Sequence, residues 1–175
     1  RVEATGNGSV SVAGYGGDGG EGFGVGVGWS NQITTATGPL TLWGRGGSTA
    51  NFNTGVELRG AVVIYGGAIS ITGYGGGVST SGSTDNYGVD ISGDVGSAVL
   101  SYGGPISILG KGGGSGSGSY NDGVYIYGTT VVATSGSVFI DGRAGAGDNG
   151  TGVQIFNSTV TATGAGNHVT INGVG

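Results

Sequence analysis

Two residue types are missing from the chain: it contains no cysteine and no methionine. Without cysteine the protein can form neither a disulfide framework nor a thiolate metal site. Histidine occurs once, as His168, so a Cys–His pair and a multi-histidine metal site are excluded as well. We therefore predict no enzyme and no cofactor. A lack of cysteine also fits a large secreted bacterial protein.

Charge of either sign is scarce. Charged residues make up 9% of the chain, its formal net charge is −5, and it has five basic residues. Nucleic acid is therefore excluded as a partner, because its recognition needs a basic patch. No apolar run is long enough for a membrane span, and the first residues lack a signal-peptide pattern. From the start at Arg1 we expect a processed or excised piece.

Glycine dominates what is present, with 47 residues, whereas proline occurs only as Pro39 and Pro105. No strict Gly-x-y period exists, so collagen is excluded. A flexible linker is also excluded, because 35% of the residues are apolar and they alternate with polar ones. We expect most glycines to supply positive φ in turns between short strands.

A phrase of the form apolar-x-apolar-x-Gly returns six times, with its glycines 29 to 37 residues apart. A period in this range is typical of a repeat architecture. The copies are Val10–Gly14, Leu40–Gly44, Ile69–Gly73, Ile106–Gly110, Val138–Gly142 and Val169–Gly173.

Two further strand-like phrases separate successive copies. The second phrase reads Gly-apolar-x-apolar, as in Gly55–Leu58 and Gly123–Ile126. The third is looser, as in residues 62–64 and 131–133. Alternation of apolar and polar residues predicts strands with one buried face, and no window has helical spacing.

Three short strands per repeat predict an all-β parallel β-helix (β-solenoid), right-handed, with one coil per repeat of about 30 residues. Residues 1–175 would form one segment of about five to six coils, without a separate domain. A β-sandwich is the alternative, but it gives no reason for one repeated three-strand phrase. One internal column would comprise Val12, Leu42, Ile71, Ile108, Ile140 and Ile171.

The repeats vary in length between the first and second strands, where residues 75–86 and 112–121 should form external loops on one edge. The chain starts on a third strand and stops just after a first strand. Bare solenoid ends are unpaired edges that invite another chain. We therefore expect end-to-end or lateral self-association, or a longer array, and hence a fibre.

Asparagine recurs two residues before three second-strand glycines, as Asn53, Asn86 and Asn121. Stacked asparagines hydrogen-bond along the axis and tolerate the left-handed backbone conformation, which predicts a structural ladder. Calcium is the competing interpretation. The aspartates near the same edge are Asp18, Asp85, Asp122 and Asp148, but the nine-residue period of calcium β-rolls is absent.

The residue after each first-strand glycine forms a second column. Its members are Tyr15, Arg45, Tyr74, Lys111 and Arg143. Outward neighbours of this kind could form cation–π contacts. We interpret the column as surface stabilisation, with the binding of sugar or of a neighbouring filament as the alternative.

Three asparagines stand in sequons for glycosylation: Asn7, Asn149 and Asn157. Carboxylate pairs are the remaining route to catalysis, since polysaccharide hydrolysis needs two such groups close together. The candidates are Glu57 with Asp90 by stacking, and Asp90 with Asp94 by sequence. Neither pair has supporting residues.

The repeats resemble the β-strand-repeat regions of very large secreted bacterial proteins, including filamentous-haemagglutinin-like adhesins and related exoproteins. The phrases Ile69–Gly76, Tyr120–Ile126 and Val160–Gly164 carry the resemblance. It implies stalks or fibres outside the cell, with a surface, matrix or adhesive role. The coils here are longer than the roughly 20-residue coils of the haemagglutinin pattern.

We therefore expect an extracellular or cell-surface structural protein that forms or extends a β-solenoid fibre, with surface glycans as a further partner. The alternative is a carbohydrate-binding or carbohydrate-cleaving β-helix. Ice binding is a weaker rival, because the threonine pairs do not repeat in one column.

Overall fold

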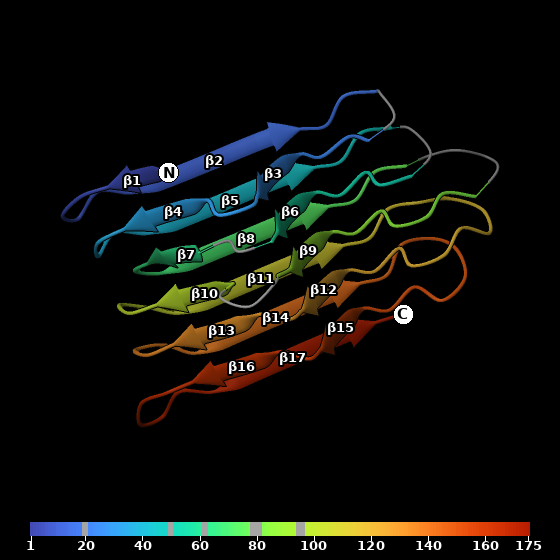
Figure 1. Cartoon of the computed structure of the whole chain (residues 1–175). Coiled ribbons are helices and arrows are strands. Elements are labelled where there is room, and N and C mark those ends of the chain that lie inside the picture. The colour runs from blue at the N-terminus through green and yellow to red at the C-terminus, as the bar shows by residue number, and fades with distance from the viewer. Residues whose placement is uncertain (19–20, 49–50, 61–62, 78–81, 94–96) are drawn as a thin grey trace.

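The computed structural model describes residues 1–18, 21–48, 51–60, 63–77, 82–93 and 97–175. Regular structure in these ranges is entirely β, so no helix there is suited to crossing a membrane. Its 17 strands form three parallel sheets, stacked coil upon coil along one axis (Figure 1). The predicted all-β parallel β-helix with three strands per coil is confirmed, and its handedness stays a prediction.

Each full coil contributes one strand to each sheet, so that sheets I and III have six strands and sheet II has five. Sheet I contains β2 (Val10–Tyr15), β5 (Leu40–Arg45), β8 (Ile69–Tyr74), β11 (Ile106–Lys111), β14 (Val138–Arg143) and β17 (Val169–Val174). Sheet II contains β3 (Val25–Gly28), β6 (Val56–Arg59), β9 (Val89–Ser92), β12 (Val124–Tyr127) and β15 (Val153–Phe156). Sheet III contains β1 (Val2–Ala4), β4 (Gln32–Thr35), β7 (Val63–Gly66), β10 (Ala98–Ser101), β13 (Thr130–Ala133) and β16 (Thr159–Ala162).

The strands pair without a shift in register, so equivalent residues of successive coils stack. The predicted column from Val12 to Ile171 is found as consecutive partners across sheet I. In the middle coils its side chains are fully buried, as for Ile71 and Ile108 at 0% exposure. Burying one such side chain contributes about 1.5–3 kcal/mol. A single coil cannot bury its apolar face, but the stack can.

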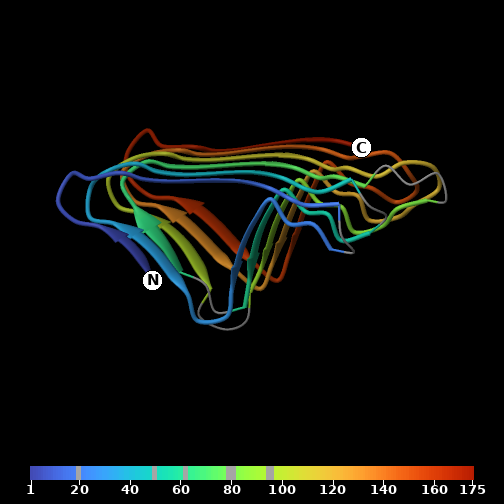
Figure 2. The ribbon, with the colours of Figure 1, turned by 90° about the horizontal axis from the view of Figure 1, so that it is seen from above.

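A second structural region projects from the tube between sheets I and II (Figure 2). We call it the wing: the described residues of 16–24, 46–55, 75–88, 112–123 and 144–152. The expected external loops lie on this edge, although 78–81 fall outside the described residues. Length also varies between the second and third strands, because β12 and β13 are closer in sequence than β9 and β10. The variation in repeat length is therefore not confined to the stretch between the first and second strands, where the sequence predicts it.

The repeated first-strand glycines have a different role from the one expected. A Cβ on Gly110 would lie 2.0 Å from the carbonyl oxygen of Gly123, and one on Gly44 would lie 1.9 Å from that of Gly55. Positive φ occurs at ten described glycines, none of which closes the repeated phrase. These glycines instead allow the outgoing and returning strands to touch where the wing leaves the tube.

The two layers of the wing are joined backbone to backbone. The amide of Gly76 donates to the carbonyl of Asn53 at 2.7 Å, and the amide of Gly113 donates to that of Asn86 at 2.7 Å. Other amides donate along the axis, as Gly114 does to Gly76 at 2.7 Å. Hydrogen bonds therefore run in two directions through the wing, between its two layers and along the solenoid axis.

Candidate functional site

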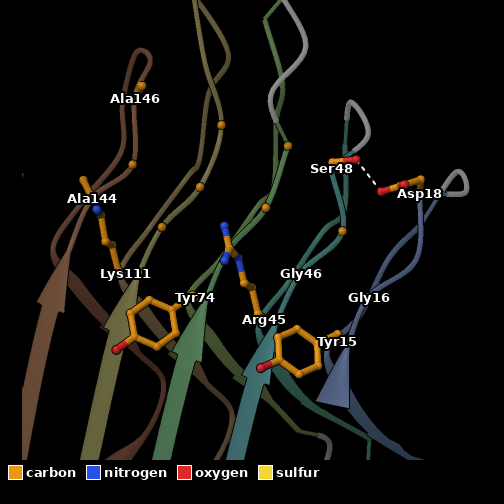
Figure 3. Close-up of a pocket in the computed structure, with 18 of the residues that line it drawn as sticks. Tyr15, Gly16, Asp18, Arg45, Gly46, Ser48, Tyr74, Lys111, Ala144 and Ala146 are labelled. Atoms are coloured by element: carbon orange, nitrogen blue, oxygen red, sulfur yellow. Dashed lines mark hydrogen bonds between the residues drawn. The ribbon is translucent and has the colours of Figure 1, made fainter.

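A shallow cleft of about 930 Å³ lies where sheet I continues into the wing (Figure 3). It crosses five successive coils, and the wing side is formed mostly by glycines and alanines such as Gly46, Gly76 and Ala144. Asp18 and Ser48, which are hydrogen-bonded to each other, line it at the N-terminal coils. A smaller hollow of about 310 Å³ adjoins it and shares Tyr74 and Lys111. Together they form a groove parallel to the solenoid axis.

The predicted Tyr/Arg/Lys column borders this groove. Tyr15, Arg45, Tyr74, Lys111 and Arg143 are consecutive partners at the ends of the sheet I strands. All five are exposed, with Tyr15 at 76% and Tyr74 at 42%. Within the described part of the chain, no ion pair joins Arg45, Lys111 or Arg143 to a carboxylate. The column therefore presents three cations to the solvent.

The ring contacts of this column involve an aromatic residue that the column itself does not include. Trp43 lies 5.0 Å from Tyr15 and 6.1 Å from Tyr74 between ring centroids, with tilted or edge-on geometry. The tyrosines thus pack against Trp43, where cation–π neighbours had been expected. The sequence signal that identifies Trp43 is strand alternation. Trp43 lies two residues before Arg45, so both side chains point to the same face of the strand.

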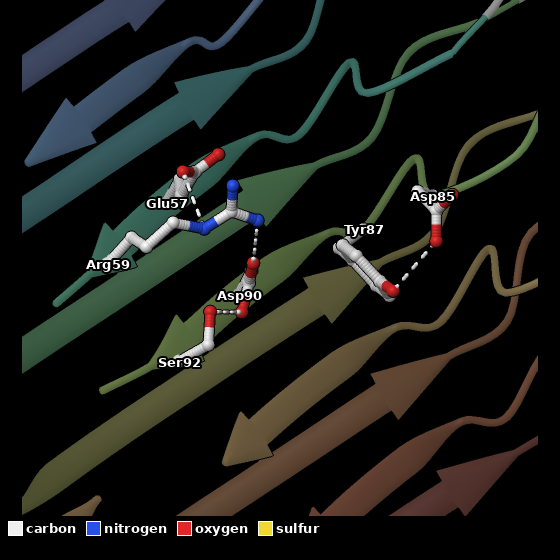
Figure 4. A network of polar contacts seen from close by, with 6 residues as sticks. All are labelled: Glu57, Arg59, Asp85, Tyr87, Asp90 and Ser92. Carbon is white, nitrogen blue, oxygen red and sulfur yellow. Dashed lines mark hydrogen bonds and ion pairs between the residues drawn. The ribbon is translucent and has the colours of Figure 1, made fainter. Parts of the chain in front are cut away.

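A second polar site lies on the outer face of sheet II (Figure 4). The structure brings the predicted pair Glu57 and Asp90 together as register partners. Arg59 bridges them, with Nε 3.2 Å from Glu57 Oε1 and Nη2 3.4 Å from Asp90 Oδ2. Ser92 donates to Asp90 at 2.6 Å. The alternative partner Asp94 lies outside the described residues.

Both carboxyls in this cluster are buried, at 8% exposure for Glu57 and 1% for Asp90. Burial raises the pKa of Glu57 from 4.5 to about 7, opposed by the Arg59 charge and reinforced by Asp90 and Glu21. Burial likewise raises the pKa of Asp90 against the Ser92 hydrogen bond and Arg59. The cluster can hold a proton near neutral pH, but its carboxyls are closed to a substrate.

Four aromatic rings continue this outer face beside the carboxylates. Tyr87 and Tyr125 stack at 5.4 Å, Tyr125 and Tyr127 at 6.3 Å, and Tyr127 and Phe156 at 5.7 Å between centroids. Interplanar angles of 19°, 3° and 6° make this a continuous stack. Such ring contacts stabilise the sheet, while Tyr127 and Phe156 at one end of the stack remain 39% and 60% exposed.

The asparagines predicted to form a ladder lie inside the wing. Asn53, Asn86 and Asn121 are 0–1% exposed. The side-chain nitrogen of Asn53 donates to Asn86 Oδ1 at 3.2 Å, and that of Asn86 donates to Asn121 Oδ1 at 3.0 Å. Each Oδ1 also accepts the backbone amide of the preceding asparagine in the ladder. At the ladder positions, the backbone amides of Asn53 and Asn86 thus pair with side-chain oxygens of the next coil in place of backbone carbonyls.

The backbone at these asparagines differs from the expectation. Positive φ is found one residue earlier, at Phe52 (56°), Asp85 (56°) and Tyr120 (58°). The equivalent residue of the last coil, Asn149, also has φ of 59°. Aromatic residues rarely adopt this conformation, and no sequence signal marks it at Phe52 or Tyr120. The turn is therefore set by the stacked neighbours.

The aspartates weighed as calcium ligands are not brought together. Asp122 is buried and accepts the Thr151 amide at 2.7 Å, whereas Asp85 accepts from the Tyr87 hydroxyl at 3.0 Å. Asp18 accepts from Ser48, and Asp148 is exposed. In the described ranges, no three metal-ligating side chains form a group.

The sequons and the histidine lie on the surface. Asn7, Asn149 and Asn157 are exposed, and Asn149 and Asn157 have positive φ. Asn7 accepts the Thr37 hydroxyl at 2.7 Å. His168 is also exposed, and its backbone amide donates to Ser137.

Comparison of the chain with protein-family models, with curated proteins and with solved structures gave no match.

Proposed function

We propose that the protein is an extracellular or cell-surface structural protein, in which the solenoid forms or extends a fibre by axial stacking of coils. The observation that carries the proposal is the unshifted register of the strands, which stacks equivalent apolar residues in columns that a further coil can continue. Val169 and Ile171 of β17 are 41% and 46% exposed, whereas their partners Val138 and Ile140 are fully buried. Covering these side chains with another coil removes apolar surface from water.

The two ends are complementary in register. Val10 begins the same column that Val169 ends, and every intervening pair is unshifted. A further coil placed on β17 would therefore continue each column and each hydrogen-bond ladder. The covering coil belongs either to the same polypeptide or to a second copy. The cysteine-free composition and the resemblance to secreted β-strand repeats support an extracellular setting.

Electron microscopy of the purified chain over a range of concentrations tests this function. We expect uniform filaments, with a fibre-diffraction repeat of about 4.8 Å along the axis. Ile171→Lys should abolish the filaments, because it places a charge in the column at the joint. Val174→Lys is the matched control, since Val174 lies on the same strand in the outward column of Arg143. Monomers at every concentration, or filaments of Ile171→Lys, would overturn end-to-end stacking.

A further inference from the structure

The distribution of positive charge is uneven for so acidic a protein. Of the five basic residues, Arg1 pairs with Glu3 at 2.6 Å, and Arg59 pairs with Glu57 and Asp90. The other three, Arg45, Lys111 and Arg143, lie in one column along the groove and have no ion-pair partner in the described ranges. Their clustering, against a net charge of −5, indicates an anionic ligand there.

The groove also offers apolar ring surface. Tyr15 is 76% exposed, and its ring meets Trp43 at 62°, which leaves ring faces uncovered. Tyr74 lies on the other side of Trp43, at 53°. Aromatic residues that combine an apolar face with a polar tip are typical of binding surfaces for amphipathic ligands. A sugar ring, with C–H faces and hydroxyl edges, is such a ligand.

The floor and the spacing favour an extended polymer. Glycines such as Gly46, Gly76 and Gly113 have no side chains, so a chain can lie against the wing backbone. Successive coils are about 4.8 Å apart, which places Arg45 and Lys111 about 10 Å apart along the axis. This is roughly the length of a disaccharide unit.

We propose that this groove binds a linear polysaccharide bearing carboxylate groups, a polyuronic acid. Two of the three free cations are arginines, whose planar fork matches a carboxylate. The sugar rings pack on Tyr15, Trp43 and Tyr74, while the carboxylates pair with the cation column. Duplex nucleic acid is disfavoured, because it carries one negative charge per about 1.7 Å of its axis and needs more cations than the three in this column.

Calorimetric titration with polygalacturonate oligosaccharides tests the proposal, with the fully methyl-esterified oligosaccharides as the uncharged control. We expect the protein to bind only the unesterified oligosaccharides, whose carboxylates are ionised. The affinity should fall as the salt concentration is raised. The double variant Arg45→Gln/Lys111→Gln should bind at least tenfold more weakly. Arg1→Gln removes one charge outside the groove and should leave the affinity unchanged. Tyr15→Ala should weaken it about threefold to tenfold.

The remaining outcomes are equally decisive. Equal affinity for the esterified and the unesterified oligosaccharides would mean that the cations take no part in binding. That result would overturn the proposal. Equal binding of polyglutamate would overturn it too, by showing that charge alone, without sugar, is recognised. Absence of binding to polygalacturonate, with filament formation retained, would reject this ligand while leaving the structural function intact.

Discussion

The tube and the wing are two ways of stacking the same coils. In the tube, columns of Ile, Leu and Val fill the space between the three sheets, and the middle coils bury them completely. In the wing, two backbone layers meet directly, and carbonyls of one layer accept amides of the other, as Asn86 does from Gly113. The tube is therefore held mainly by apolar burial, and the wing by hydrogen bonds and close contact.

The difference shows why one chain needs both apolar alternation and abundant glycine. A buried Ile contributes about 1.5–3 kcal/mol, whereas a hydrogen bond contributes about 0.5–1.5 kcal/mol net. The wing compensates by number, because almost every amide near its base is paired. Because most wing residues that line the groove are glycines and alanines, the wing also leaves a floor with few side chains beside the cation column, where a polymer can lie.

The largest effect is expected in the tube. Ile108→Ala removes a fully buried side chain in the middle of the stack and should lower the free energy of unfolding by about 2–5 kcal/mol. Leu109→Ala is the control, because Leu109 faces outward on the same strand and is only half-buried. Chemical denaturation followed by circular dichroism measures both. Similar losses for the two variants would contradict a core carried by the inner columns.

A glycine substitution probes the wing in the same way. A Cβ on Gly113 would lie 1.9 Å from the Gly76 carbonyl oxygen, so Gly113→Ala should cost about 3 kcal/mol. The damage should stay local, with faster hydrogen exchange at wing amides such as Gly77 and Gly114 and little change in the tube.

Gly103→Ala is the matched control for this substitution. A Cβ at Gly103 would meet its nearest neighbour at an ordinary 3.6 Å, and its φ is not positive. If Gly113→Ala were as stable as Gly103→Ala, close backbone contact would not be what holds the wing.

The titration of Glu57 tests a contribution of charge to stability, distinct from apolar burial in the tube and backbone contact in the wing. Its pKa is raised by burial to about 7 from 4.5, so the folded state retains a proton that the unfolded chain has lost. Stability should therefore fall as pH rises from about 5 to 8, by about 2 kcal/mol. Glu57→Gln should flatten this dependence in denaturation curves. An unchanged slope in the variant would assign the pH effect to another group.

The tube was predictable from the sequence because its signals are local. Alternation within each phrase fixes which side chains point inward, and the common period fixes their partners, so Val12 and Leu42 were correctly placed in one column. The asparagine spacing likewise indicated which side chains stack. In each case the sequence separation alone determines the neighbour.

The wing and the sheet II cluster were less predictable because they depend on contacts across layers. Alternation places Glu57 and Asp90 on the outer face, yet both are buried there. The role of Gly110 depends on a carbonyl contributed by the returning strand. Positive φ at Phe52 follows from its stacked surroundings, since its residue type disfavours that conformation.

The smallest effect is expected at the asparagine ladder, which tests whether side chains contribute to holding the wing together. Asn86→Ala removes the Oδ1 that accepts from Asn53 and the nitrogen that donates to Asn121. We expect a loss of about 1–2 kcal/mol in unfolding free energy, whereas Asn172→Ala on the exposed last strand should change little.

Because the ladder acts as one network, Asn86→Ala and Asn121→Ala combined should cost less than the sum of the two single losses. Denaturation of the two single variants and the double variant measures this coupling. Strict additivity would mean that each asparagine acts alone, and that the wing is held by its backbone contacts without a side-chain network.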